Sequence, residues 1–409
     1  MFIPVLLLAI AVLSAAVAAY GTHPFWAQYA HGVELIVWSR RLEWPLVLFS
    51  LILCIVLLGL IVSGKRRAWW LIGLGPVLAL FVHRFVTDPA GGLTVIENPT
   101  FAAAPDAPIV PNDDDYIVGL HFGDSYFAYP YSILFDNPVI LQSDHEKCMM
   151  LMWSAFANRA VGQTINRDVR ARDIEIVSMP ANAMLLYNRA DGQFINALTG
   201  QLINGKKPVG FGAPVVLSTT TWRQWRDSNP LTKIMQPPAA AKPRTAAPPH
   251  GPIQPAYPMP PAILDYPANS SIVLIGTTQP AALKADDVGP EPQRVQVDGV
   301  PAFVFRESPD KPVRAFSCYL KKQELFPRFS LDRDHKIKNA MFIDSDTGSA
   351  WSANGVWVGG QYKKEMQGSR LIPLPVQDRL YWGVMKFWYP ELTLRTGERE
   401  QKSAVTSGS

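Results

Sequence analysis

The chain has 409 residues, of which 48% are apolar and 18% charged, so it is longer than one ordinary domain and is expected to hold two or three structural units. Its net charge of +4 is small for this length, and no stripe of Arg and Lys interleaved with aromatic residues is present, so no nucleic-acid partner is expected. The 36 prolines argue against long soluble helices and favour strands, turns and extended linkers.

The first 90 residues contain three apolar runs, Phe2–Tyr20, Trp44–Val62 and Trp69–Val86. Each has about 18–19 residues, close to the roughly 20 that an α-helix needs to cross the hydrocarbon core of a bilayer. Residues 1–90 are therefore predicted to be a membrane anchor of three transmembrane helices. The alternative for the first run is a signal peptide, because Ala16-Val17-Ala18 resembles a cleavage site. No basic residue precedes this run, which favours a retained helix.

Basic residues predict how the anchor is oriented in the bilayer. Lys65-Arg66-Arg67 lies in the short loop between the second and third runs, and such loops stay cytoplasmic. The amino terminus is then cytoplasmic, while residues 21–43 and the chain beyond about residue 88 lie outside. Arg40 and Arg41 favour the opposite orientation, but they supply two positive charges against the three of Lys65-Arg66-Arg67. The expected location is a bacterial inner (plasma) membrane, with the C-terminal part in the periplasm or outside the cell.

A stretch rich in Pro and Ala divides the rest of the chain. Residues 236–261 show no apolar period and are predicted to be an extended, semi-rigid linker. The linker separates residues 91–235 from residues 262–398, and the polar tail 399–409 is predicted to be disordered.

The two halves that flank the linker resemble each other. Both contain an Asn-Ala-Met segment that precedes a strand-like run, then two glycines five residues apart, then a Trp eight residues before a Pro. These features are NAMLLYNRADGQ from Asn182 and NAMFIDSDTGS from Asn339, Gly200 to Gly205 and Gly355 to Gly360, and Trp222 to Pro230 and Trp382 to Pro390. Repetition of this kind predicts two copies of one module.

Short apolar runs bounded by Gly, Asp and Asn recur within each half, and runs of this length with turn residues at their ends predict strands. The stretch from Thr219 to Pro230 is expected to form one short helix. The fold class that follows is transmembrane α-helices at the N-terminus, then a mainly-β soluble part, with some α+β character, made of two similar modules.

The order of several elements resembles a bacterial family known as a domain of unknown function, DUF 3179. The elements are a Gly turn before an Ala-Tyr-Pro segment, a Tyr-Asp-Arg-like turn, paired glycines and a closing Thr-x-Trp-x-x-Trp segment. They lie here at Gly123, Ala128-Tyr129-Pro130, Tyr187-Asn188-Arg189, and Thr220 to Trp225. The resemblance covers about residues 105–235, and a second, less faithful copy covers about residues 265–395 with an Asp-x-x-Thr-Gly-Ser-x-Trp element at Asp344 to Trp351.

The family pattern also includes a His-Glu pair and a Cys-Pro-Leu-Cys element, and this sequence departs from both. The His and Glu positions are Asn137 and Pro138, and the two Cys positions are Ser154 and Ala157. Ser is a poor metal ligand and Ala has no donor atom, so no metal is expected there. Ser154 and Ala157 are expected on or just after a strand. The nearby methionines are spaced for two faces of a strand and are predicted to be core residues; they are Met149, Met150 and Met152.

No catalytic residue, cofactor site or metal site is predicted. The candidate site residues are aromatic side chains that either contact a partner or close a module; they are Trp222, Trp225, Trp382, Trp388 and Tyr389. The other polar groups are expected to be structural or solvated, namely His121, the acidic loop Asn112 to Asp115, and Asp144-His145-Glu146 beside Cys148. Whether Cys148 pairs with Cys318 stays open at this point.

The first functional hypothesis is a membrane-anchored, extracytoplasmic interaction or scaffold protein, an accessory subunit of a membrane complex with a protein partner. The anchor, the tandem modules and the missing Cys pair favour it. The alternative is an enzyme or metal-handling protein of unknown substrate, with its site in one of the β-rich modules.

Overall fold

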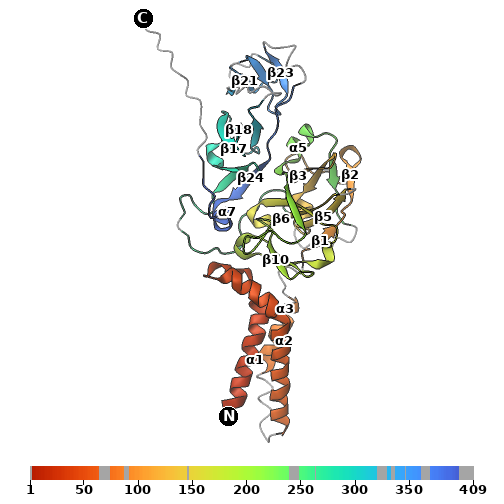
Figure 1. Ribbon diagram of the computed structural model, residues 1–409, viewed down its shortest axis with the longest axis vertical. Coiled ribbons are helices and arrows are strands. Elements are labelled where there is room, and N and C mark those ends of the chain that lie inside the picture. The colour runs from red at the N-terminus through yellow and green to blue at the C-terminus, as the bar shows by residue number, and fades with distance from the viewer. Residues whose placement is uncertain are drawn as a thin grey trace.

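The computed structural model has two parts, a helical stalk with the N-terminus at its far end and a β-rich part that carries the C-terminal half of the chain (Figure 1). It describes residues 2–63, 74–86, 92–144, 147–238, 248–262, 264–319, 329–332, 337–345, 347–360 and 369–395. Apolar helices followed by a mainly-β part were predicted from the sequence, and this fold class is confirmed. The predicted tail 399–409 lies outside the described residues.

The stalk contains α1 (Phe2–Tyr20), the short 3-10 helix η1 (Pro24–Gln28), α2 (Gly32–Ser63) and α3 (Gly75–Val86). Two of these helices, α1 and α2, are long and apolar enough to cross a membrane by length and composition. The third predicted span is described only as α3, because residues 64–73 lie outside the described part of the chain.

The position where α2 begins corrects the sequence-based expectation. The segment 21–43 was predicted to be a loop. The helix already begins at Gly32 and continues without interruption through Pro45, so residues 32–43 are helical. The reason is tertiary packing. Val33 and Ile36 lie on one face of this first part of the helix and are buried in a cluster with Val177 and other residues of the β-rich part. An apolar stripe of this kind stabilises a helix outside a bilayer.

The first half of the β-rich part, residues 92–235, contains fourteen strands in the described residues. They are β1 (Val95–Glu97), β2 (Phe101–Ala103), β3 (Tyr116–Phe122), β4 (Ser125–Pro130), β5 (Val139–Asp144), β6 (Lys147–Ser154), β7 (Arg159–Ile165), β8 (Ile174–Ser178), β9 (Leu185–Asn188), β10 (Gln193–Asn196), β11 (Gln201–Leu202), β12 (Phe211–Val215), β13 (Leu217–Thr221) and β14 (Lys233–Met235). The helices α4 (Tyr131–Leu134) and α5 (Trp222–Ser228) follow β4 and β13.

The second half, residues 264–395, contains ten strands in the described residues. They are β15 (Ser271–Ile275), β16 (Ala281–Lys284), β17 (Gln293–Val297), β18 (Val300–Phe305), β19 (Arg314–Ser317), β20 (Phe329–Leu331), β21 (Phe342–Asp344), β22 (Ser349–Trp351), β23 (Trp357–Gly360) and β24 (Val376–Tyr381). The helix α7 (Trp382–Trp388) follows β24 directly.

Ten strands of each half have the same order in their sheets, whereas β1, β2, β12 and β14 of the first half have no counterpart among the described strands of the second. In the first half the sheets contain β5-β6-β7, β8-β9-β10-β11 and β13-β3-β4; in the second half they contain β17-β18-β19, β20-β21-β22-β23 and β24-β15-β16. The repeated glycines also agree in conformation, since Gly200, Gly205, Gly355 and Gly360 all have positive φ.

The two halves share one eight-stranded sheet, in the order β16-β15-β24-β13-β3-β4-β14-β2. The strands β13 and β24, where the two halves meet, are parallel and are joined through Thr219 and Gln377. Side-chain hydroxyls complete this pairing, because the backbone N–H of Val376 donates to Ser218 Oγ (3.4 Å) and that of Asp378 donates to Thr219 Oγ1 (3.0 Å). Each half therefore covers a sheet edge of the other, which protects both edges from further pairing.

A buried polar cluster holds this seam together. The carboxylate of Asp378 is fully buried and accepts from Arg306 Nη2 at 2.9 Å and from the backbone N–H of Val313 at 3.2 Å. Asn158, in the left-handed conformation at φ 53°, donates from Nδ2 to the carbonyl of Asp378 at 2.9 Å. Gln377 donates to and accepts from the backbone of Ala160 in the first half. Removing one partner of an ion pair that is buried in this way strongly destabilises a protein.

The described part of the Pro-rich stretch, residues 248–262, contains no helix or strand and is bonded to the first half. The carbonyl of His250 accepts from the backbone N–H of Tyr116 at 2.7 Å. The side chain of Asn182 accepts from the backbone N–H groups of Ala256 and Tyr257 and donates to the carbonyl of Tyr257, each at 2.8 Å. These bonds hold residues 250–257 against the first half.

Candidate functional site

The five aromatic residues singled out in the sequence lie on or next to the two equivalent helices α5 and α7. Trp222 and Trp382 are the first residues of these helices and are fully buried. Trp388 donates from Nε1 to the carbonyl of Ala181 at 3.4 Å, and the hydroxyl of Tyr389 donates to the carbonyl of Leu198 at 2.8 Å. Four of the five thus pack within the chain, and the fifth, Trp225, lines a cavity.

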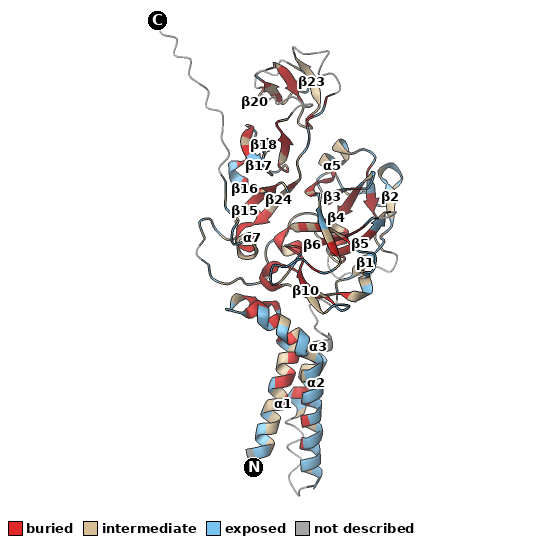
Figure 2. Cartoon of the chain, in the orientation of Figure 1, coloured by how far each residue is buried: buried red, intermediate tan, exposed pale blue. Residues whose placement is uncertain are grey.

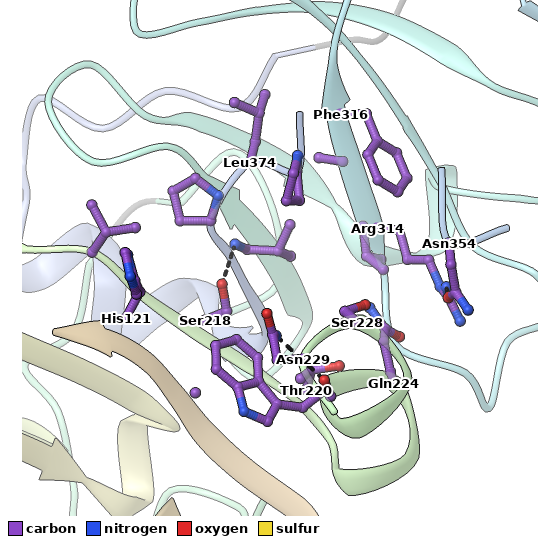
Figure 3. Close-up of a pocket in the computed structure, with 18 of the residues that line it drawn as sticks. His121, Ser218, Thr220, Gln224, Ser228, Asn229, Arg314, Phe316, Asn354 and Leu374 are labelled. Atoms are coloured by element: carbon purple, nitrogen blue, oxygen red, sulfur yellow. Dashed lines mark hydrogen bonds between the residues drawn. The ribbon is translucent and has the colours of Figure 1, made fainter. Parts of the chain in front are cut away.

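This cavity, of about 410 Å³, lies between the two halves and is called the inter-half cleft here (Figure 3). One wall comes from β3, β4, β13 and α5, and the other from β19 and the segments around Asn354 and residues 370–376. The first-half residues are Gly119, His121, Tyr126, Val216, Ser218, Thr219, Thr220, Gln224, Trp225, Ser228 and Asn229; the second-half residues are Val313, Arg314, Ala315, Phe316, Asn354, Arg370, Leu371, Pro373, Leu374, Pro375 and Val376.

Trp225 is held in place by β3 and by its own hydrogen bond. Its Nε1 donates to Thr232 Oγ1 at 2.9 Å. The indole lies over Gly119, where a Cβ atom would meet the ring at 2.4 Å, so only glycine leaves room for the ring at this position. Tyr126 packs edge-on against the indole at 6.3 Å, and His121 stacks on Tyr126 at 4.6 Å. The three rings form an aromatic side of the cleft.

Arg314 is the most buried cation of the opposite wall. Its Nη2 lies 2.8 Å from a carboxylate oxygen of Glu307, and its Nη1 donates to Asn354 Oδ1. Burial lowers the pKa of the Arg314 guanidinium below its ordinary value, while Glu307 and Asp227 oppose this shift. Arg370 donates from Nη1 to the carbonyl of Ser228 at 3.1 Å, which connects the two walls.

Three buried polar atoms of residues that line the cleft have no protein hydrogen-bond partner: Thr220 Oγ1, Gln224 Oε1 and Arg314 Nε. A buried polar group without a partner destabilises a fold by about 1–3 kcal/mol. Atoms in the same state also occur away from the cleft, for example Trp153 Nε1 and Trp351 Nε1. In Figure 3, Gln224 and Ser228 of α5 lie at the same end of the cleft as Arg314 and Asn354.

Among the described lining residues of the cleft there is no Asp, Glu or Cys. His121 and Tyr126 are the lining side chains that could take part in acid–base chemistry. In the described part of the chain, no group of three or more His, Cys, Asp and Glu residues could hold a metal ion.

The positions where the family pattern has Cys are structural. Ser154 is the last residue of β6 and its Oγ accepts from the backbone N–H of Met184 at 3.2 Å. Ala157 is buried in the 3-10 turn η4 (Ala155–Ala157) directly after β6, so both residues lie where the sequence predicted them. Met149 packs on one face of β6, and Met150 and Met152 pack on the other, as predicted.

Ion pairs hold the acidic loop Asn112 to Asp115 in position. Asp113 lies 3.0 Å from Arg223 and 2.9 Å from Arg226 of α5, and Asp114 lies 3.3 Å from Lys311 of the second half. The loop thus positions α5, one wall of the cleft.

Of the remaining polar candidates that the structure describes, His121 lines the cleft, whereas Asp144 and Cys148 do not. Cys148 and Cys318 are both free. His145 and Glu146 lie outside the described residues.

The sequence pointed to only one wall of the cleft. The closing segment with Trp222 and Trp225 was singled out, but Arg314 and Asn354 were not, because nothing in their local sequence differs from an ordinary strand or turn. The repeat itself held a signal for the second wall. If each half ends a sheet on an equivalent strand, these two edge strands can pair and bring the neighbouring segments of both halves together.

Fold and cleft together define a mainly-β protein with long apolar N-terminal helices and a cleft between its two halves. A family model described as "Protein of unknown function (DUF3179)" matches residues 90–392, more than half of the chain, and the chain therefore belongs to this family. The match is one continuous stretch, so the two tandem copies stay a prediction. No curated protein and no solved structure matches the chain.

Because Gly119 contacts Trp225, we expect substitutions at these two positions to have strongly non-additive effects on the free energy of unfolding. Gly119→Ala should destabilise the protein by about 1–3 kcal/mol, because the new methyl group must displace the indole. In a Trp225→Leu background the same substitution should have much less effect. Denaturant unfolding of the four variants in detergent measures this coupling, and an equal effect of Gly119→Ala in both backgrounds would contradict the described packing.

Proposed function

We propose that the protein is a membrane-anchored, extracytoplasmic interaction or scaffold protein, an accessory subunit of a membrane complex. Its N-terminal helices would lie in a bilayer and hold the β-rich part at the surface. Apolar side chains along α2 support the anchor, since Trp44, Leu48 and Ile55 are 66%, 61% and 67% exposed (Figure 2). Such a surface is stable in lipid rather than in water.

The carrying observation is the rigid connection between α2 and the β-rich part. Arg40 of α2 donates from Nε and Nη2 to the carboxylate of Glu175 at 2.9 and 2.6 Å, and from Nη1 to Glu43 at 2.8 Å. The side chains of Arg40 and Glu175 are only 12% and 20% exposed, and Arg189 adds a second cation at 2.9 Å from Glu175. A free enzyme needs no fixed distance from the membrane, whereas a scaffold for a membrane partner does.

Geometry also supports the proposed orientation. The 32 residues of α2 span about 48 Å, more than the ~30 Å hydrocarbon core, so its first third would stand outside the bilayer against the β-rich part. This places Arg40 and Arg41 on the side of the β-rich part, where Arg41 lies over the ring of Phe194 at 5.4 Å. These two charges are therefore engaged by the protein and do not oppose a cytoplasmic amino terminus.

The matching strand orders of the two halves support the further proposal that they are two copies of one module. A single copy would leave the edge of β13 or β24 open. Two copies cover these edges and create the inter-half cleft at the same time. We infer that duplication produced the binding surface.

Orientation is tested with a reporter that is active only in the cytoplasm. Fused to the C-terminus of the full chain, it should be inactive, because the β-rich part is proposed to lie outside. A fusion after residue 67, in the predicted cytoplasmic loop, should be active and serves as the matched control. Activity of the C-terminal fusion would overturn the orientation.

The scaffold role is tested by purification from native membranes in mild detergent. A second polypeptide in fixed stoichiometry, seen as a larger mass by light scattering, is the expected result. A monomer that carries a stoichiometric metal ion would instead favour the alternative, an enzyme or metal-handling protein.

Stability of the connection between helix and β-rich part should depend on pH through Glu175. Burial raises the pKa of this carboxyl, but Arg40 and Arg189 outweigh burial and lower the pKa below its ordinary value. The stabilisation is therefore present above the unfolded-state pKa of about 4.3 and is lost as the pH falls through the folded-state value. Glu175→Gln should be roughly 1–2 kcal/mol less stable than the wild type at pH 7, and this gap should close below about pH 4.

Thermal unfolding in detergent across this pH range measures the gap. Glu97→Gln is the control, because the pair of Glu97 with Arg170 is more exposed and should contribute little. A gap that is independent of pH would contradict the ionic role of Glu175.

A further inference from the structure

Three connecting segments meet at one end of the four-stranded sheet β8-β9-β10-β11. Asn188 of β9 pairs with Ile174 at the start of β8 and with Gln193 at the start of β10. Beyond β11, the backbone N–H of Ile203 donates to the carbonyl of Phe194 at 3.3 Å, so the chain continues past the same end. This end of the sheet, called the charged end here, consists of residues 170–173, 189–192 and 203–207.

Basic side chains outnumber acidic ones at the charged end. It holds five cations and two carboxylates; they are Arg170, Arg172, Arg189, Lys206 and Lys207, and Asp173 and Asp191. The segments at the opposite end of the sheet, 179–184 and 197–200, contain no charged residue. The charge of this sheet is therefore concentrated at one end and is positive there.

Some of these cations are used within the chain. Arg170 lies 3.2 Å from Glu97, and Arg189 lies 2.9 Å from Glu175. Lys206 and Lys207 are exposed and form no ion pair with the described residues. The surplus positive charge of the charged end is thus carried mainly by these two lysines, which leaves them available to an external anion.

Contacts with α2 show which end of the sheet is nearer to the anchor. Val177, near the end of β8, packs in one cluster with Ile36. Glu175, near the start of β8, bonds to Arg40, which lies one turn further along α2. The strand β8 therefore runs away from the apolar run of α2, and the charged end faces that run. In Figure 1 this sheet, marked by β10, adjoins the stalk.

Helix geometry places the charged end at the depth of lipid headgroups. Arg40 precedes Trp44, the first residue of the apolar run, by four residues, which is about 6 Å of helix. The headgroup layer on each side of a bilayer is about 5–8 Å thick. Arg41 lies over the ring of Phe194 at 5.4 Å, so β10 begins at the same level. Charges at this depth lie within about one Debye length, roughly 8 Å at physiological ionic strength, of lipid phosphates.

An exposed apolar side chain accompanies the lysines. Val209 is 64% exposed, and its backbone N–H donates to Gln193 Oε1 at 3.0 Å, which holds it beside the charged end. Basic side chains next to an exposed apolar one are typical of protein surfaces that contact the interface of a bilayer.

We propose that the charged end binds anionic phospholipid headgroups of the bilayer that holds the stalk, with Lys206 and Lys207 on their phosphate groups. This inference rests on the proposed membrane anchor and adds a ligand for the β-rich part itself. An acidic protein would also attract these lysines, but the phosphate layer lies at their depth whenever the stalk spans the bilayer, so lipid is the favoured ligand.

The test places the full chain in nanodiscs of phosphatidylcholine, either alone or mixed with phosphatidylglycerol. Lysines are acylated with a water-soluble ester and quantified by mass spectrometry. Acylation of Lys206 and Lys207 should be about 5-fold slower with phosphatidylglycerol, because each contact with an anionic headgroup shields the amine. About 1 M salt should remove this difference. Lys233, exposed on β14 and away from the charged end, is the internal control and should react equally in both.

Variants test the same lysines through the lipids that they retain. The wild type, captured with its surrounding lipid from mixed vesicles, should be enriched in phosphatidylglycerol. Lys206→Gln/Lys207→Gln should lose most of this enrichment. The matched control Lys233→Gln/Lys284→Gln removes the same charge elsewhere and should keep it.

Equal acylation in the two nanodiscs, or equal enrichment in the two double variants, would overturn the proposal. Protection of the lysines only in a complex purified from native membranes would also overturn it and would assign the charged end to a protein partner. Vesicle flotation separates this inference from the proposed anchor. A chain that does not float with vesicles contradicts both, whereas a chain that floats without any effect of phosphatidylglycerol contradicts this inference alone.

Discussion

The parallel pairing of β13 with β24 is the contact on which the rest of the β-rich part depends. Its backbone pairing is short, with Thr219 and Gln377 as the paired residues. Hydroxyl groups and the buried carboxylate of Asp378 complete it. Because Asp378 is bonded to Arg306 and Val313 of its own half and to Asn158 of the other, the two halves are coupled through fully desolvated polar groups. Removing one partner of such a buried ion pair leaves the other charge uncompensated and strongly destabilises the fold.

This seam also explains where the cleft lies. Joining the sheets edge to edge brings α5 and β3 of one half close to β19 of the other, and the space between them stays open on one side of the sheet. One apolar cluster joins β8 of the first half, the stalk and α7, since Val177, Ile36 and Trp388 pack in it.

The errors of the sequence-based predictions have one cause, which is contact between residues that are far apart in the chain. Residues 32–43 were predicted to be part of a connection because they follow an apolar run and contain charges, yet Val33 and Ile36 find an apolar surface on the β-rich part and Arg40 finds Glu175. Neither partner is close in sequence. For the same reason the sequence indicated only one wall of the cleft, since Arg314 lies on a strand of the other half.

Local pattern was sufficient for the apolar helices, the mainly-β class, the family and the core positions of Met149, Met150 and Met152, because each depends on periodicity, composition or the order of nearby elements. The strand pairing across the seam, the helical start of α2 and the meeting of Gln224 with Arg314 at one cavity were decided by tertiary structure. These features depend on contacts between residues more than 80 positions apart, and a sheet edge or a buried charge has no local sequence pattern that names its partner.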